Sequence, residues 1–440
     1  MGLVFLGRIM KKKRINVPPV AGVSYPGFDD LSQFGAVRIT SKRPLSKEVL
    51  KLDTDIMIHL TVTGRCYAQC KGCVNSAITM GSDNPRNTVV TSQDVEPERD
   101  ALIIKELADR HPDQKITVCF YGGEPFLASD KMEQTWRIFK DSDEPDRFRF
   151  MVYTNGELLI DTLAAYPEFM KDIWLYSVSI DGDEEQHNRV RQGTKLSKIK
   201  DNLREFSSFY QGNILHWSTL REEQSLLNCF EEFMRLSDEG LVNHFFWHWA
   251  EEREPFQNFP HFVRQYGQDL ESVMNIYVQK ISKGELLPIA HINELILFLL
   301  TSSDRGHTAC GVELAKNYDV VSGNVYSCAD LPSSHAIGGL DERKKLRMDE
   351  YDLNSLVEYK EWLGCHECGV HFYCGGRCPV QVLAGSKERT YQYCQLMRLH
   401  VGLVQERISD IFEGIQRHGI TLQEIFDRSA FLARYTDVVP

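Results

Sequence analysis

The sequence has little that would place it in a membrane or on a nucleic acid. Its 440 residues contain no run of about twenty apolar residues, the length that a membrane-spanning helix needs. Basic residues are outnumbered, with 50 Lys and Arg against 62 Asp and Glu, and the formal net charge is −12. This charge argues against binding along a phosphate backbone. We therefore expect neither a membrane nor a nucleic acid as a partner.

The amino-terminal residues also lack the pattern of a secretory signal. Their apolar stretch is short, and the basic run at residues 11–14 follows it instead of preceding it. We interpret this run as a solvated tail, and either Met1 or Met10 is the initiator. The sequence thus predicts a cytoplasmic protein.

Twelve cysteines are many for a chain in a reducing compartment. Cys119 and Cys229 stand alone in apolar stretches, which predicts two ordinary core residues. The other ten fall into two close groups. Such clustering indicates metal or iron–sulfur ligands in place of disulfides.

Strand-like and helix-like stretches alternate from residue 54 onward. Short apolar or alternating runs predict strands over 55–62, 116–121, 148–153, 174–180, 214–219 and 245–249. Helical periodicity lies near 94–110, 129–141, 158–170, 196–210 and 223–238. Six such units predict an α/β fold with a parallel sheet wrapped by helices, a partial (β/α)6 barrel and not a closed eight-unit barrel.

The rest of the chain divides around this barrel. We expect an N-terminal extension with possible short strands at 1–53, the barrel at 54–254, a helical bridge at 255–304, a cysteine-rich module at 305–400 and C-terminal helices at 401–440. After residue 394 the periodicity predicts one amphipathic helix to about residue 417 and a shorter one beyond it.

The first cysteine group follows the first predicted strand. Cys66, Cys70 and Cys73 form the pattern C-x3-C-x2-C. Three thiolates on one short loop can hold three irons of a [4Fe–4S] cube and leave the fourth iron open. A zinc site would need a fourth ligand, and no Cys or His stands nearby to supply it, although a distant residue could.

This loop, together with Tyr121-Gly122-Gly123-Glu124-Pro125 at the end of the second strand, resembles the radical S-adenosylmethionine (AdoMet, SAM) superfamily. The resemblance implies that the open iron binds AdoMet and that its cleavage yields a 5′-deoxyadenosyl radical. It also implies AdoMet contacts from Tyr121, Gly122, Gly123, Glu124, Asn155, Ser179, Asp181 and Arg191. For Asn155 the alternative is a cap on a strand end, and for Arg191 it is a plain surface arginine. The family usually has an aromatic residue where this chain has Gly72.

The second cysteine group resembles the SPASM domain that follows the barrel in many radical SAM enzymes. Its members are Cys310, Cys328, Cys365, Cys368, Cys374, Cys378 and Cys394. By this resemblance, Cys365, Cys368, Cys374 and Cys394 ligate an outer auxiliary [4Fe–4S] cluster, and Cys310, Cys328 and Cys378 ligate an inner one, for three clusters in all. The inner cluster is then one ligand short. Asp304, His307, a water or a substrate thiol are the candidates for that position.

SPASM enzymes mostly modify peptides, so the leading hypothesis is a maturase that cross-links a ribosomally made precursor peptide by radical oxidation. Such an enzyme needs a reductant such as flavodoxin or ferredoxin. Only about fifty residues precede the barrel, too few for a whole winged-helix peptide-recognition domain. Leader recognition would then fall to a truncated version, a separate protein or the bridge region.

Two other hypotheses stay open. One is a side-chain dehydrogenase like the sulfatase maturases, although Ala329 stands where those enzymes carry a catalytic aspartate. Asp330 is its possible substitute, and His248, at the end of the sixth strand, is a second catalytic candidate. The last hypothesis is a non-catalytic iron–sulfur carrier or binding protein, against which the Gly-Gly-Glu-Pro loop argues.

Overall fold

A computed structural model describes residues 13–14, 55–77, 94–436 and 438–440 of the chain. The predicted extension over residues 1–53 lies outside this description, apart from β1 (Lys13–Arg14), which pairs in parallel with β14 (Tyr351–Asp352). None of the described helices is long and apolar enough to cross a membrane.

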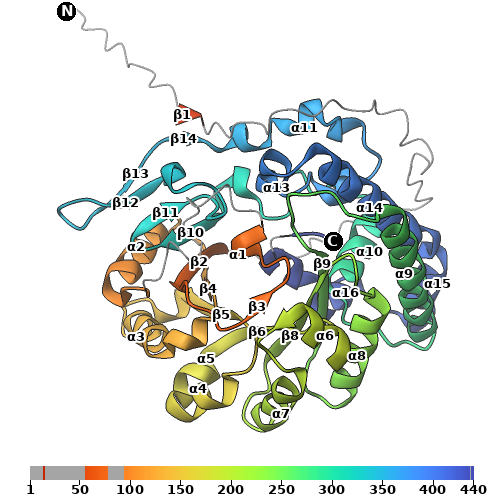
Figure 1. The fold of residues 1–440 in the computed structure, drawn as a ribbon, viewed down its shortest axis with the longest axis horizontal. Coiled ribbons are helices and arrows are strands. Elements are labelled where there is room, and N and C mark those ends of the chain that lie inside the picture. Colours follow the sequence, from red (N-terminus) through yellow and green to blue (C-terminus); the bar gives the residue numbers. More distant parts are fainter. Residues whose placement is uncertain (1–12, 15–54, 78–93, 437) are drawn as a thin grey trace, which may run out of the picture.

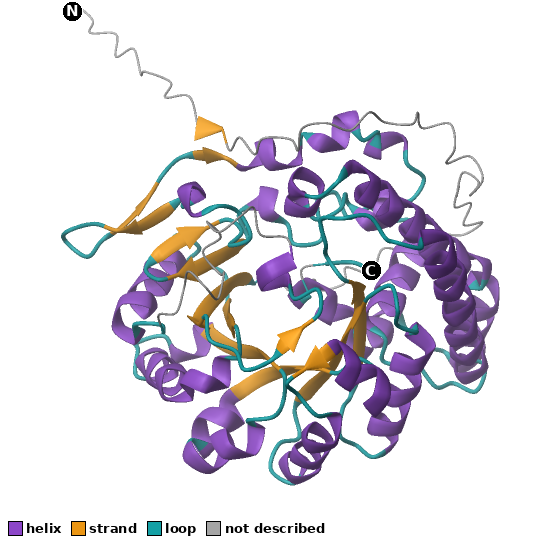
Figure 2. Ribbon diagram, in the orientation of Figure 1, coloured by secondary structure: helices purple, strands orange, loops and turns teal. Residues whose placement is uncertain are grey.

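Six parallel strands form the barrel, as the sequence predicts. They are β2 (Ile56–Thr63), β4 (Ile116–Gly122), β5 (Phe148–Thr154), β6 (Ile173–Ser179), β8 (Asn213–Leu220) and β9 (His244–Trp249), paired in this order. Every adjacent pair among them is parallel. The sheet curves around an interior with helices on its outer side (Figures 1 and 2). The partial-barrel fold is therefore confirmed.

The covering helices follow the strands in sequence. They are α2 (Pro97–Asp109), α3 (Ser129–Lys140), α4 (Leu159–Ala165), α5 (Pro167–Asp172), α6 (Glu184–Val190), α7 (Leu196–Ser207) and α8 (Leu226–Asp238). The single helix predicted over 158–170 is two helices. Pro167 begins the second, because proline has no N–H to donate within a continuing helix but suits a helix start.

The cysteine-rich part of the chain extends the same sheet. Strand β10 (Asn317–Val321) pairs in parallel with β2, and β11 (Asn324–Tyr326), β12 (Gly338–Leu340) and β13 (Leu346–Met348) continue the sheet in antiparallel fashion. This placement brings Cys310 and Cys328, which flank β10 in the chain, to the side of the barrel formed by β2. The domain boundary near residue 305 stays a prediction.

Longer helices complete the molecule. They are α9 (Phe259–Ile281), α10 (Ala290–Thr301), α14 (Lys387–Glu406), α15 (Ile408–His418) and α16 (Leu422–Arg428), with the short helices α1 (Val74–Ala77), α11 (Tyr359–Trp362), α12 (His371–Cys374) and α13 (Pro379–Ala384). The one helix expected between Cys394 and residue 417 is divided at Arg407, where α14 ends and α15 begins.

The barrel interior has an apolar layer toward the amino ends of the strands, called the lower layer below. One inward-facing residue from each strand contributes to it: Met57, Cys119, Met151, Leu175, Leu215 and Phe246. The C-terminal 3-10 helix η8 (Ala430–Tyr435) fills the centre of this layer with Leu432 and Tyr435. Tyr153 also donates a hydrogen bond of 2.6 Å from its hydroxyl to the Tyr435 carbonyl. The end of the chain thus returns into the barrel, as Figure 1 shows.

This packing predicts that the returning segment supports the whole barrel. Leu432 is 0% exposed, so Leu432→Ala should lower the free energy of unfolding by about 2–5 kcal/mol. Leu314, 45% exposed, is the matched control, and Leu314→Ala should change it by less than about 0.5 kcal/mol. Urea unfolding followed by circular dichroism measures both values. Equal, small effects would contradict this role of the returning segment.

Candidate active site

A cavity of about 580 Å³ lies at the carboxyl ends of the barrel strands. It is lined by cysteines from both sequence groups: Cys66, Cys70, Cys73, Cys310, Cys328 and Cys378. Parallel strands place their carboxyl ends at one rim, where cofactor and substrate sites are built in such folds. The two cysteine groups, over two hundred residues apart in the chain, thus meet at one site.

The loop with the first three cysteines is fixed from the opposite side of the barrel. Its short strand β3 (Gln69–Cys70) pairs with β7 (Arg191–Gln192), so that Cys70 lies opposite Arg191. The Lys71 N–H donates to the Val190 carbonyl at 2.9 Å, and the Arg221 side chain donates to the Lys71 carbonyl. Burial raises the pKa of Cys73, so its thiolate needs a compensating positive charge.

The Gly-Gly-Glu-Pro loop packs directly against the start of this cysteine loop. The N–H of Gly123 donates to the Thr63 carbonyl and that of Glu124 donates to the Arg65 carbonyl, both at 2.9 Å. A Cβ atom on Gly123 would stand 2.2 Å from the Arg65 oxygen, and Gly122 has φ of 140°. Both glycines are therefore required for backbone contact between the two loops.

Glu124 ties the second strand to the third. Its carboxylate accepts hydrogen bonds from the Asn155 N–H at 2.8 Å, the Thr154 hydroxyl at 2.9 Å and the Phe126 N–H at 3.2 Å. Burial raises the pKa of Glu124 to about 7, despite these donors. Glu124 lines the cavity, but its hydrogen bonds serve mainly to hold the two strand ends together.

Asn155 presents a free donor to the cavity. Its Oδ1 accepts hydrogen bonds from the Tyr67 hydroxyl at 2.8 Å and from the Glu157 N–H at 3.0 Å. Its Nδ2 is buried and has no partner among the described residues. A buried amide without a partner costs free energy, so a bound ligand is its natural acceptor.

Asp181 lies behind the cavity wall. It is 0% exposed, and its Oδ2 is 2.6 Å from Arg191 Nε and 2.8 Å from Arg221 Nη1. Burial works to raise the pKa of Asp181, but the two guanidinium groups outweigh it and hold that pKa well below the usual range. Arg191, Arg221 and Ser179 line the cavity, whereas Asp181 positions the arginines. Arg221, just beyond the end of β8, is a site residue that the sequence did not indicate.

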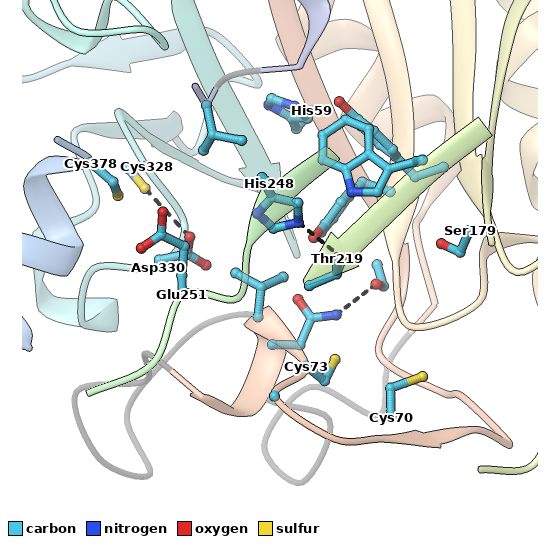
Figure 3. A pocket seen from close by; sticks show the side chains of 18 of the residues that line it. His59, Cys70, Cys73, Ser179, Thr219, His248, Glu251, Cys328, Asp330 and Cys378 are labelled. Atoms are coloured by element: carbon cyan, nitrogen blue, oxygen red, sulfur yellow. Dashed lines mark hydrogen bonds between the residues drawn. The ribbon is translucent and has the colours of Figure 1, made fainter. Parts of the chain in front are cut away.

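Both catalytic candidates, His248 and Asp330, line the cavity (Figure 3). His248 Nε2 is 3.0 Å from the Thr219 hydroxyl, and its Nδ1 is buried without a partner in the described part of the chain. Burial lowers the pKa of His248 to about 3, so the imidazole is neutral near pH 7. The Asp330 carboxylate lies 3.9 Å from Cys328 Sγ.

Above the apolar layer, the strands carry rings that form an aromatic belt: His59, Tyr121, Tyr153, Trp217 and His248. Successive ring centroids are 5.9, 5.3, 5.2 and 5.4 Å apart. Each ring stands two positions after a residue of the lower layer, which is the period of a strand. The belt gives the cavity an apolar wall for a substrate.

Gly72 occupies the position where the family usually has an aromatic residue, and the structure does not accommodate a side chain there. This residue has φ of 60°, and a Cβ atom there would lie 2.6 Å from Glu252 Oε1. A side chain at this position would be strained whatever its character.

The remaining four cysteines lie away from the cavity but near one another. Negative charge on one thiolate would raise the pKa of others in the set of Cys365, Cys368, Cys374 and Cys394. Burial is the largest cause, and it raises the pKa of Cys365 to about 12 and also raises those of Cys374 and Cys394. The assignment of these four cysteines to one auxiliary cluster, and of Cys310, Cys328 and Cys378 to another, stays a prediction. Buried thiols release their protons when they bind a metal centre.

Residues 60–217 match the family model of the Radical SAM superfamily. They form a radical SAM domain. No curated protein gives a match to the sequence. Among solved structures, anSMEcpe with bound AdoMet is similar, with a TM-score of 0.60 and 14% identity over 83% of this chain and 99% of that chain.

Two peptide complexes are also similar in structure. One is anSMEcpe with bound AdoMet and Cp18Cys peptide, with a TM-score of 0.59 and 15% identity over 81% of this chain and 99% of that chain. The other is Streptococcus suis SuiB bound to precursor peptide SuiA, with a TM-score of 0.46 and 12% identity over 76% of this chain and 74% of that chain. The likeness to anSMEcpe shows a shared fold across the radical SAM domain and the cysteine-rich part.

A radical SAM domain implies one [4Fe–4S] cluster and AdoMet, and the residues present fit both. Three cysteines of one loop face the cavity, and Asn155 Nδ2 offers an unused donor beside them. Within the described residues, no three or more His, Cys, Asp or Glu are grouped to hold a metal ion. That finding concerns ligands around one ion, whereas a cube binds each thiolate through a different iron.

The geometry of Asn155 predicts a direct role in AdoMet binding. Asn155→Asp keeps an oxygen for Tyr67 and Glu157 but removes the Nδ2 donor, so AdoMet should bind roughly 10- to 100-fold more weakly, the effect of losing about 1.5–3 kcal/mol. Tyr67→Phe, which leaves that donor in place, should have a smaller effect. Equilibrium dialysis with parallel iron analysis measures this, and an unchanged Kd for Asn155→Asp would contradict it.

Proposed function

We propose that this chain is a radical SAM oxidase that removes two hydrogens from a precursor peptide and joins two of its residues by a cross-link. The observation that supports this proposal is the meeting of Cys66, Cys70 and Cys73 with Cys310, Cys328 and Cys378 around one cavity. A substrate in that cavity would lie next to the cysteines proposed for the AdoMet cluster, which generates the radical, and next to those proposed for the inner cluster, which accepts an electron.

The proposal includes three [4Fe–4S] clusters. The cluster on Cys66, Cys70 and Cys73 supplies, when reduced by a flavodoxin or ferredoxin, the electron that cleaves AdoMet into methionine and a 5′-deoxyadenosyl radical. The inner auxiliary cluster belongs to Cys310, Cys328 and Cys378, and the outer one to Cys365, Cys368, Cys374 and Cys394.

The residues of the cavity have separate tasks in this reaction. Asn155 and Arg191 hold the amino-acid part of AdoMet, and Ser179 lies beside them on the rim. The aromatic belt holds the substrate side chain and excludes water.

A two-electron oxidation would take one hydrogen atom, one electron and one proton from the substrate; the cluster held by Cys310, Cys328 and Cys378 would supply a place for the electron, and a base of this chain would take the proton. His248, neutral and with an unpartnered Nδ1, and Asp330 are two residues lining the cavity that could accept this proton.

A peptide substrate is supported by the fold. The structure of anSMEcpe, which has this fold, contains bound AdoMet and Cp18Cys peptide, and this supports a peptide as the substrate. A separate leader-recognition protein is the partner we propose for guiding the precursor.

A second candidate function is a side-chain dehydrogenase of the sulfatase-maturase kind. The observation in its favour is Asp330, which faces the cavity next to Cys328 and so stands where a base would be needed. In this reaction the second hydrogen leaves from the same side chain, and no cross-link forms.

The cluster content is directly measurable. After anaerobic reconstitution, the protein should hold about twelve irons per chain, and Cys66→Ala/Cys70→Ala/Cys73→Ala should hold about eight, because each cube contributes four irons. Iron analysis with Mössbauer spectroscopy measures both. About four irons in the parent protein would show that the auxiliary clusters are absent.

The product distinguishes the two candidate functions. Where a short reading frame adjoins this gene, the peptide that it encodes, incubated with the reduced enzyme and AdoMet, should lose two hydrogens and resist fragmentation between the joined residues. Trapping with hydroxylamine should give no adduct. An aldehyde that hydroxylamine captures, with normal fragmentation, would favour the dehydrogenase and contradict the cross-link.

A further inference from the structure

Glu251 stands at the junction between the barrel and the second cysteine group. It follows β9 by two residues and is 5% exposed. It lines the large cavity and also a small adjoining hollow, in which Cys310 and Cys378 are its neighbours. Figure 3 shows Glu251, Asp330, Cys328 and Cys378 on the same side of the cavity.

One oxygen of the Glu251 carboxylate is engaged and the other is not. Oε1 accepts a hydrogen bond from Arg377 Nη2 at 2.5 Å. Oε2 is buried and has no hydrogen-bond partner in the described part of the chain. A buried carboxylate oxygen without a partner is costly, and a bound cation or metal centre removes that cost.

The free oxygen lies in the neighbourhood of the inner cysteines. Cys310 and Cys378 line the small hollow together with Glu251, and Cys328 lines the large cavity with all three. Cys310, Cys328 and Cys378 provide three thiolates, whereas a cube has four irons. A carboxylate is thus available on the side where a thiolate is missing.

The two side chains that the sequence suggested as the fourth ligand point elsewhere. Asp304 is exposed, and its Oδ1 accepts a hydrogen bond from the Gly306 N–H at 2.7 Å. His307 Nδ1 is 2.6 Å from the Thr308 carbonyl in its own loop. Neither residue lines the large cavity or the small hollow.

We infer that Glu251 ligates, through Oε2, the iron of the inner auxiliary cluster that Cys310, Cys328 and Cys378 leave without a thiolate. This inference rests on the auxiliary clusters of the proposed function. Arg377 lies between Cys374 and Cys378 in the chain, and its ion pair aims the carboxylate. The inner cluster is then bound by the barrel as well as by the cysteine-rich part, and it has no unligated iron for a substrate.

The test uses Cys66→Ala/Cys70→Ala/Cys73→Ala, which lacks the AdoMet cluster and keeps the auxiliary ones. In this background Glu251→Gln should reduce the iron content from about eight to about seven per chain, because a cube with three thiolates readily loses its fourth iron. Electron paramagnetic resonance of the oxidised protein should show a new [3Fe–4S] signal. Glu251→Cys should restore the iron and change the spectrum of the reduced inner cluster.

Glu294 provides a matched control. It is also a buried glutamate paired with an arginine, 2.7 Å from Arg305, and it lines neither hollow. Glu294→Gln should leave iron content and spectra unchanged. Full iron and an unaltered spectrum in Glu251→Gln would overturn the inference but not the proposed function. If Glu251→Gln does not fold, an unaltered spectrum in Glu251→Cys would do the same. A background variant without iron would overturn the proposed function together with it.

Discussion

The buried ion cluster of Asp181, Arg191 and Arg221 is the interaction on which the site depends. Asp181 bonds to both arginines without exposure to solvent, and each arginine reaches the loop of the first cysteines. Arg191 does so through the pairing of β7 with β3, and Arg221 through the Lys71 carbonyl. Removal of one partner from a buried pair of this kind costs about 3–5 kcal/mol, because it strands a charge. The loop is thereby held over the barrel before any cofactor binds.

A second constraint is the layered interior of the barrel. Apolar residues of the strands pack around Leu432 and Tyr435 in the lower layer, and the aromatic belt lies two residues further along the strands. The cavity lies on the side of the lower layer where Cys66, Cys70 and Cys73 meet Cys310, Cys328 and Cys378. The chain therefore needs its last elements to form the floor of a site whose other parts come from residues 56–380.

Much of this arrangement is readable from the sequence. The strands of the barrel were predictable because they are short apolar or alternating runs between helical stretches, and the two cysteine groups were visible as clusters in the chain. Cys119 and Cys229 are buried core residues, as expected. The rest depends on contacts between distant segments. The strands β11, β12 and β13 have only three residues each and show no periodicity.

The position of Asp181 shows that side-chain alternation ends where a strand ends. Alternation continued past residue 179 would put Asp181 on the same face as Ser179, another of the AdoMet contacts that the resemblance implies. Strand β6, however, ends at Ser179, and beyond that point alternation no longer sets the direction of a side chain. Asp181 instead turns toward two arginines that come from later segments. Similarly, the need for Gly123 comes from the Arg65 carbonyl, a contact that is not visible in the motif.

Reductive cleavage of AdoMet tests the central claim most directly. The anaerobically reconstituted protein, reduced with dithionite in the presence of AdoMet, should form 5′-deoxyadenosine. Cys70→Ala should form none while keeping its auxiliary clusters. A protein that holds the iron of its first cluster and still yields no 5′-deoxyadenosine would contradict the account, because the loop of Cys66, Cys70 and Cys73 would then serve another purpose.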